Sequence, residues 1–499
     1  MKKKIIIAAA AAVVLGAAVY AQKISDSSSL TKQLEEAAQN ETGENPEAEQ
    51  NETGENPEAE QNETGEKPEA AQNETGEKPE KPQDTGTLTN KEDIVDNRGE
   101  DIKERLIYVP VHFTYSACPS LGDIRAIIVS VDFPDVKFTP EALTGNELKE
   151  SVFGKTNTEG YPFENVTSYY ERASYGNINI TGDTYTYTAK HEMGYYEKAE
   201  GGSDILAREV LEALDGQIDY NEYDSNMDGV LDLVIFNVPA VPYEGDESFW
   251  YSATYYWSYG TENFAGDGIE IYQYIIVDDQ TYDIGYFNSV LCHETGHMMG
   301  LPDYYLYEVE DWEGYHGDMG NELMDDACGD FSSFSKLMLG WLPDEKVNVY
   351  SGGEQEFTLN DASCEPSCII IPRYKSEYCD YMGEYFIIEY TSSTENNYRN
   401  YSEGGVRMFH VCAYPDYMSR QFKYEAFSTY YDNTNNGIRI TRLVNDGSIF
   451  YTSGDIITYG TENFAWYDSE GQQNIDPEIA VTIGKFENNT YIINISENK

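Results

Sequence analysis

Apolar and polar positions follow two different patterns along this chain, and the change comes near residue 342. Before it, short apolar runs that predict buried strands alternate with stretches in which apolar residues recur every three to four positions, as in helices. The predicted strands are 124–131, 177–181, 184–188, 231–238 and 271–277; the predicted helices are 165–172, 203–215 (N-cap Ser203), 288–300 and 332–339. Strands with interposed helices predict an α/β or α+β domain, which we place at 105–343.

After residue 342 the chain has short β-type runs separated by turns, and no long amphipathic helix is predicted. Several short strands of this kind are typical of a β-sandwich, so residues 344–499 are predicted to form a β-rich C-terminal domain. The clearest runs are 368–371, 384–390, 406–411, 437–443 and 491–495.

The first residues predict export from the cytoplasm. Three lysines precede an apolar run over residues 5–20, and Val19-Tyr20-Ala21 resembles a signal-peptidase site. This pattern predicts a signal peptide over 1–21, and the alanine-rich run is typical of bacteria. An uncleaved signal anchor is the alternative, and either reading places the rest of the chain outside the cytoplasm, secreted or tethered at the cell surface.

Residues 22–104 are predicted to be an acidic low-complexity linker or pro-segment. A Gln-Asn-Glu-Thr-Gly-Glu repeat recurs every eleven residues from Gln39, and its copies contain no large apolar residue that could form a core. The whole chain has a formal net charge of −58, which argues against nucleic acid or an anionic membrane surface as its partner. Forty per cent hydrophobic residues nevertheless indicate globular domains after this segment.

The chemistry of the sequence centres on His293-Glu294-Thr-Gly-His297. Residues four apart lie on one face of a helix, so the two imidazoles can hold one zinc ion. Glu294 can reach a water on that ion and act as general base. Gly300 permits a sharp turn after the helix, and Asp303 can then return as a third, oxygen ligand. Three protein ligands with one open position is the arrangement of catalytic zinc.

Other residues could compete for the place of third ligand. His316, Asp318 and Glu322 all lie on the stretch that leads to Met324. His316 is also a candidate for the substrate cleft, although an exposed loop histidine is the simpler reading.

The extended zinc motif resembles that of the metzincin zinc peptidases, and the surrounding chain resembles the immune inhibitor A-like secreted metallopeptidases of bacteria. This resemblance implies a metzincin-like α+β domain, with a mixed sheet and an active-site helix, followed by a β-sandwich-like domain. It also implies that Met324 lies in a tight turn beneath the metal. The resembling segments are 127–135 (ending Phe-Pro-Asp), 168–176 (Ser-Tyr-Tyr-Glu-Arg-Ala-Ser-Tyr-Gly), 223–232, 335–341 and 404–411. The chain departs from the family pattern at Cys412, where an acid is expected, and no tyrosine closely follows Met324.

A second metal is predicted in an acidic loop. Asp224, Asn226, Asp228 and Asp232 follow the oxygen spacing of a calcium loop around Gly229, but Ile235 occupies the place of the usual twelfth-position glutamate. The loop is therefore no EF-hand, and a plain acidic glycine turn is the alternative to calcium binding.

The seven cysteines are too few for a disulfide-dense scaffold. Cys364, Cys368, Cys379 and Cys412 could form one or two disulfides outside the cell, and a site in which cysteines and His410 bind a metal is a weaker alternative.

Together these features predict a secreted zinc endopeptidase that cleaves extracellular proteins through a metal-activated water. A non-catalytic, calcium-stabilised surface binding protein on the same fold is the alternative, and the residues alone do not exclude a hydrolase of non-peptide bonds. The retained Glu294 favours the enzyme, because a protein without activity has no need of that base.

Overall fold

The structure is a computed structural model, and we describe residues 109–155, 160–240, 252–258, 263–305, 322–374, 381–424, 438–445 and 447–498. All of these residues belong to one compact unit of the chain. The predicted signal peptide and the repeat segment lie outside the described residues. Among the described helices, none has the length and apolarity needed to cross a membrane.

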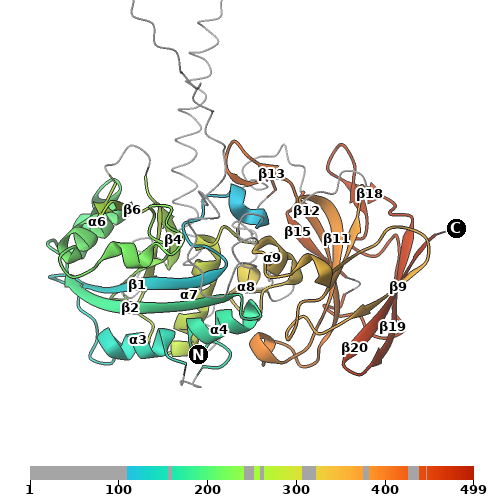
Figure 1. Cartoon of the computed structure of the whole chain (residues 1–499), viewed down its shortest axis with the longest axis horizontal. Helices are drawn as coiled ribbons and strands as arrows, with labels where there is room; N and C mark the ends of the chain where they lie inside the picture. Colours follow the sequence, from blue (N-terminus) through green and yellow to red (C-terminus); the bar gives the residue numbers. More distant parts are fainter. Residues whose placement is uncertain are drawn as a thin grey trace, which may run out of the picture. The chain divides into compact units, whose positions relative to one another are not determined.

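A five-stranded mixed sheet organises the N-terminal part, in the order β2-β1-β3-β7-β4 (Figure 1). The first four strands are parallel, and β4 runs antiparallel to β7 at the edge. Helices cover both faces, so β3 is buried throughout and β1 is buried without a break from Ala126 to Val131, as is typical of parallel sheets. The strands are β1 (Gly122–Asp132), β2 (Ile178–Thr188), β3 (Val234–Val238), β4 (Ala253–Tyr256) and β7 (Gln273–Asp278).

The two strands predicted at 177–181 and 184–188 form a single strand, β2, which corrects the sequence reading. Its pairing with β1 continues without a break from Gly122–Ile178 to Asp132–Thr188. Gly182 lies in the gap between the two predicted strands, and it is needed for packing: a Cβ there would lie 2.4 Å from the ring of Phe153. The glycine therefore makes room for a core side chain instead of ending the strand.

The helices form a layer on each face of this sheet (Figure 1). The cores on the two faces alternate along β1: Ile124, Ala126 and Ile128 belong to one, Ile127 and Val129 to the other. The first core contains residues of α3 (Gly145–Phe153), α4 (Val166–Ala173) and α7 (Ile284–Met298); the second contains residues of α5 (Met193–Lys198) and α6 (Gly202–Leu214).

Two helix starts differ from the prediction. The N-cap of α6 is Gly201, whose φ of 66° places it in the left-handed region, and Ser203 lies inside the helix. The helix predicted from 288 begins at Ile284, because Asp283 accepts a hydrogen bond from the backbone N–H of Tyr286 and caps it there.

The β-rich part consists mainly of two mostly antiparallel sheets, with orders β15-β12-β11-β10-β8 and β16-β19-β20-β9. Residues of both sheets form one hydrophobic core, as in a sandwich. The predicted fold class, an α+β domain followed by a β-rich region, is confirmed. The strands are β8 (Val347–Val349), β9 (Gln355–Leu359), β10 (Cys368–Pro372), β11 (Gly383–Thr391), β12 (Gly405–Ala413), β15 (Thr441–Val444), β16 (Ile456–Ile457), β19 (Ile479–Glu487) and β20 (Thr490–Glu497).

The remaining elements are short. They are η2 (Pro110–Phe113), η3 (Tyr220–Tyr223), β5 (Ala265–Gly266), β6 (Ile269–Glu270), α8 (Leu323–Asp326), α9 (Ser333–Met338), η4 (Asp344–Lys346), η5 (Glu395–Asn397), β13 (Pro415–Asp416), β14 (Gln421–Phe422), β17 (Trp466–Tyr467) and β18 (Gln473–Ile475).

One hydrophobic core continues from the α+β part into the β-rich part. The five-stranded sheet of the β-rich part turns Ile369 and Ile388 toward the sandwich, whereas Ile370 and Ile387 join the core that contains α7 and α9. Residues on both sides of the predicted boundary at 343/344 belong to the core that contains α7. The boundary therefore stays a prediction.

Candidate metal centre

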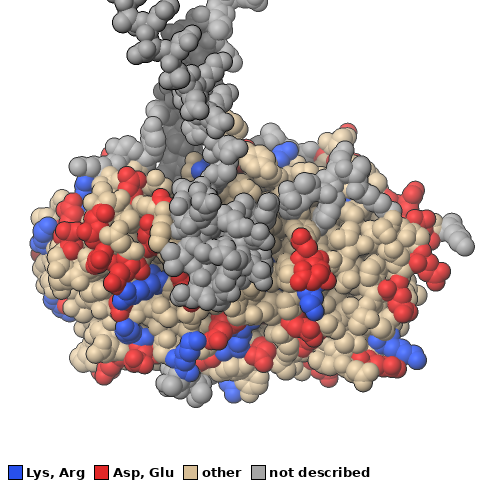
Figure 2. All heavy atoms as spheres, in the orientation of Figure 1, with Lys and Arg blue, Asp and Glu red and all other residues tan. Residues whose placement is uncertain are grey.

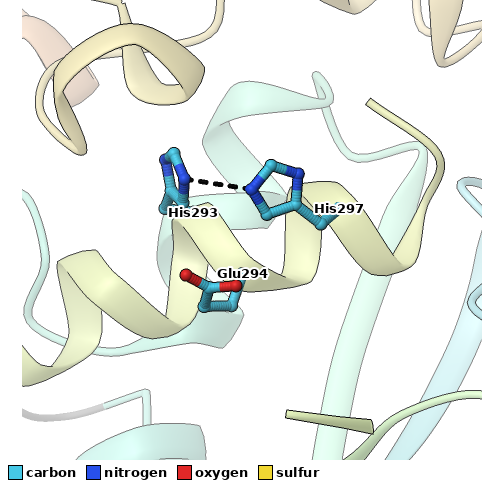
Figure 3. A group of neighbouring side chains, drawn as sticks. All are labelled: His293, Glu294 and His297. Atoms are coloured by element: carbon cyan, nitrogen blue, oxygen red, sulfur yellow. Dashed lines mark hydrogen bonds between the residues drawn. The ribbon is translucent and has the colours of Figure 1, made fainter. Parts of the chain in front are cut away.

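Helix α7 places the three residues of the zinc motif at its C-terminal end. His293 and Glu294 are buried, and His297, one turn further on, keeps about a sixth of its side chain exposed (16%). Figure 3 shows the imidazole rings of His293 and His297 turned toward each other across one turn of the helix. Among the described residues, the group whose ligand atoms gather closely enough to hold a metal is His293, Glu294 and His297, all within 4.8 Å.

Asp303 joins the two histidines. Its Oδ1 lies 3.0 Å from Nε2 of His293 and 3.2 Å from Nε2 of His297, and the two Nε2 atoms are 3.1 Å apart. Ligand atoms on a tetrahedral zinc with bonds of about 2.0–2.1 Å are separated by roughly 3.3 Å. The three atoms therefore form a triangle close to the size of one face of a zinc tetrahedron.

Backbone carbonyls fix the tautomers of both histidines. Nδ1 of His293 lies 2.8 Å from the carbonyl oxygen of Leu323, and Nδ1 of His297 lies 2.8 Å from that of Leu301. A carbonyl only accepts, so Nδ1 carries the proton and the Nε2 lone pair points into the triangle when the ring is neutral. Two lone pairs and a carboxylate oxygen that converge in this way can hold a cation, and the donor set fits zinc.

The pKa values of His293, His297 and Asp303 agree with this geometry. Burial alone would lower the pKa of His297, but the adjacent Asp303 carboxylate outweighs burial and raises the pKa to about 9. The pKa of His293 is also raised against the effect of burial, by its hydrogen bond to Asp303. Conversely, burial would raise the pKa of Asp303, but the two imidazoles hold it far below its usual range. The cluster thus favours positive charge at its centre.

The turn after α7 brings Asp303 back to the histidines. Gly300 has a φ of +97°, which side-chain-bearing residues rarely adopt, and a Cβ there would lie 2.2 Å from Oγ1 of Thr114. Both the backbone conformation and the close approach of Thr114 therefore require glycine, as the sequence pattern indicated.

Glu294 is held by the edge strand of the sheet. Oγ1 of Thr254, on β4, donates to Oε2 of Glu294 at 2.9 Å. This contact fixes the carboxylate beside the histidine pair. No local pattern pointed to Thr254, because it lies 40 positions before Glu294 in a short strand.

Met324 lies in a tight turn, within the four-residue helix α8, and its sulfur lies next to Gly296 of α7. The carbonyl of the neighbouring Leu323 is the acceptor for His293, so this turn orients a ligand as well as packing against α7.

Glu322, one of the alternative third ligands allowed by the sequence, instead accepts hydrogen bonds from the protein through both carboxylate oxygens. One of its carboxylate oxygens accepts from the backbone N–H of Met324 at 2.5 Å. The other accepts from the backbone N–H of Ser332 at 3.0 Å and from Oγ of Ser335 at 2.5 Å. Glu322 thus ties the turn before Met324 to the start of α9. His316 and Asp318, the other rivals, lie outside the described residues.

The acidic loop, residues 224–232, is a turn held by hydrogen bonds among its own residues, and one of its carboxylate oxygens has no partner among the described residues. Oδ1 and Oδ2 of Asp224 accept from the backbone N–H groups of Asp228 and Gly229, and the amide of Asn226 donates to Asp228. Asp232 is fully buried and accepts from Ser225 through Oδ2, while its Oδ1 has no hydrogen-bond partner among the described residues. Burial and the neighbouring carboxylates raise the pKa of Asp232 strongly, and mainly burial raises that of Asp228 to about 7.

The cysteines among the described residues are free thiols: Cys118, Cys292, Cys328, Cys364, Cys368 and Cys412. The disulfides allowed by the sequence are therefore absent among these six, and Cys379 lies outside the described residues.

His410 is not part of a metal site in the described residues. It lies 2.9 Å from the Glu384 carboxylate and stacks on Tyr467 in the core of the β-rich part.

Comparison with known proteins adds little to this geometry. No family model matches the sequence, and no curated protein matches it. A crystal structure of wild-type OgpA from Akkermansia muciniphila matches with 14% identity over 55% of this chain and 72% of that chain, at a TM-score of 0.27. A second crystal form matches with 12% identity over 60% and 95%, also at 0.27. Scores this low do not establish a common fold.

Proposed function

We propose that this protein is a secreted zinc-dependent endopeptidase that hydrolyses peptide bonds of extracellular proteins. The observation that carries the proposal is the triangle of His293 Nε2, His297 Nε2 and Asp303 Oδ1, with sides of 3.0–3.2 Å, beside the carboxylate of Glu294. The resemblance of the sequence to immune inhibitor A-like metallopeptidases supports the same function.

The residues of the site suit hydrolysis. His293, His297 and Asp303 would hold zinc, which supplies a polarised water and an acid for the scissile carbonyl. Glu294 would take a proton from the attacking water and return it to the leaving amine. Thr254 holds one carboxylate oxygen of Glu294, so the base is oriented before substrate arrives. His297 is the most exposed of the four side chains that make up the site, and substrate would approach from its side.

The test is the substitution Glu294→Gln, which keeps the shape of the side chain and removes its basicity. We expect a folded protein that binds zinc as the parent does and hydrolyses casein about 100- to 10,000-fold more slowly than the parent. Casein hydrolysis by the parent also separates the enzyme from a non-catalytic surface binding protein. Turnover by the Glu294→Gln protein close to that of the parent would remove Glu294 from this role.

We propose calcium as a structural ion of the acidic loop. The support is the fully buried Asp232, whose Oδ1 lacks a partner among the described residues, close to the carboxylates of Asp224 and Asp228. A buried carboxylate oxygen without a partner is costly, and a bound cation would satisfy it. Asn226 would supply a neutral oxygen ligand.

The location outside the cytoplasm is part of the proposal and rests on the signal peptide predicted over 1–21. The acidic surface suits a protein that must stay soluble there, and Figure 2 shows acidic side chains spread over the visible face with fewer basic ones among them.

A further inference from the structure

The β-rich part reaches the loops of the metal centre through buried polar contacts as well as through the shared hydrophobic core. Glu389, on β11, accepts from the backbone N–H of Ser333 at 2.6 Å and forms a buried ion pair with Arg407. Asn397 accepts from the backbone N–H of Asp330 at 3.0 Å. These contacts fix the segment between the Met324 turn and α9, which lies next to α7.

Tyr304 is the residue that connects the metal-ligand loop to this segment. It follows Asp303 directly, and its backbone N–H donates to the carbonyl oxygen of Met324 at 3.0 Å. Its hydroxyl lies 2.9 Å from Oγ of Ser335, the serine that also donates to Glu322. The peptide group between Asp303 and Tyr304 is therefore held from the side of the Met324 turn.

The next peptide group is held from the β-rich part. Nη2 of Arg439 donates to the carbonyl oxygen of Tyr304 at 2.8 Å. Arg439 is 5% exposed and lies just before β15, 135 positions after Tyr304. The peptide that it holds leads to Tyr305, whose ring lies against that of His293 with a centroid separation of 6.4 Å and an interplanar angle of 27°.

We propose that Arg439 is a positioning residue for the metal centre. It fixes the Tyr304–Tyr305 peptide, and with it the loop that presents Asp303 and the ring that packs on His293. Partners one step removed from the ligands determine how well a preformed site matches the geometry of its metal. The inference rests on the proposed zinc function, and it makes the β-rich part a component of the active site.

The test measures zinc affinity in the full-length protein, by titration against a chromogenic chelator well below the melting temperature of each variant. Arg439→Gln removes the guanidinium, and Arg439→Lys keeps a positive donor. Arg442→Gln is the control, because Arg442 is on the adjoining strand β15 and its guanidinium donates to Gln473 within the β-rich part.

We expect Arg439→Gln to weaken zinc binding about 10- to 100-fold, Arg439→Lys to recover part of that loss, and Arg442→Gln to match the parent. Casein hydrolysis at saturating zinc should follow the same order, because a misplaced Asp303 also disturbs the loaded site.

A parent-like zinc affinity in Arg439→Gln overturns the inference, even if its melting temperature falls, since that is the result of a purely structural role. Failure of both Arg439 variants to fold also overturns it, because the arginine would then support the whole fold. A parent protein that binds no zinc refutes the proposed function itself, which keeps the two failures distinct.

Discussion

The sulfur of Met324 occupies the space next to Gly296 in which a side chain would otherwise lie. A Cβ added to Gly296 would be 2.5 Å from Sδ of Met324 and 3.2 Å from its Cε. Gly296 is the variable position before the second histidine of the zinc motif, and Met324 follows the residue whose carbonyl orients the first. The glycine thus allows the Met324 turn and α7 to pack closely enough for the candidate ligands to meet.

Gly296→Ala should therefore destabilise the protein by about 1–3 kcal/mol, the usual cost of an extra methyl group in a filled core. Zinc affinity should fall as well, because the Met324 turn and the Leu323 carbonyl must move. Urea unfolding and zinc titration check both effects. Gly216→Ala is the control, since a Cβ on Gly216 meets nothing within 4 Å. Adding Met324→Ala should recover part of the lost stability, and strictly additive effects would contradict the contact.

Asp303→Ala should lose zinc on dialysis. Two imidazoles remain, and removal of a ligand from a three-residue site weakens binding far more than loss of an outer partner does. Metal analysis after dialysis measures the effect. Asp326→Ala removes an exposed carboxylate from the Met324 turn and should keep zinc. Equal zinc content in the Asp303 variant and the parent would move the third ligand to His316 or Asp318.

Calcium should raise the melting temperature of the protein. A ligand that binds only the folded state at about 100 times its Kd adds about 2.7 kcal/mol. Asp228→Ala should remove most of the calcium response, whereas Asp215→Ala, at an exposed position after α6, should leave it unchanged. Melting curves of the parent that coincide with and without calcium would favour the plain acidic turn.

Asp183 should contribute stability that is lost in acid. Partial burial would raise its pKa, but hydrogen bonds from Lys149, Tyr223 and Arg125 outweigh burial and lower the pKa below its usual value. A carboxyl whose folded-state pKa is depressed stabilises the protein above the unfolded-state pKa of about 3.9, and this contribution disappears as the pH falls through the folded-state value.

Asp183→Asn should accordingly lower the free energy of unfolding by roughly 1 kcal/mol near pH 7, with a smaller difference from the parent near pH 3. Urea unfolding at the two pH values gives both differences, and Asp215→Asn is the exposed control. A difference that does not shrink in acid would show that the side chain acts through packing rather than through its charge.

Much of the fold followed from local patterns. The apolar run of β1 and the helix predicted at 165–172 are encoded within a few residues, and the structure has both elements, β1 and α4, close to the predicted positions. The local prediction was wrong where tertiary packing decided: two strands were predicted on either side of Gly182, but Gly182 makes room for the Phe153 ring within one continuous strand.

The metal centre divides in the same way. Its histidines and Glu294 could be read from the sequence because one helix carries them at fixed spacing, and Asp303 because a single glycine turn separates it from that helix. Thr254, the role of Glu322 and Arg439 could not be read in this way. The partners of Thr254 and Arg439 lie 40 and 135 positions away, and those of Glu322 lie up to 13 positions away across a turn. Only the packing of the edge strand β4, the Met324 turn and the β-rich part against α7 brings these residues to the site. Local spacing determined which atoms can meet a metal, and tertiary packing decided what holds those atoms in place.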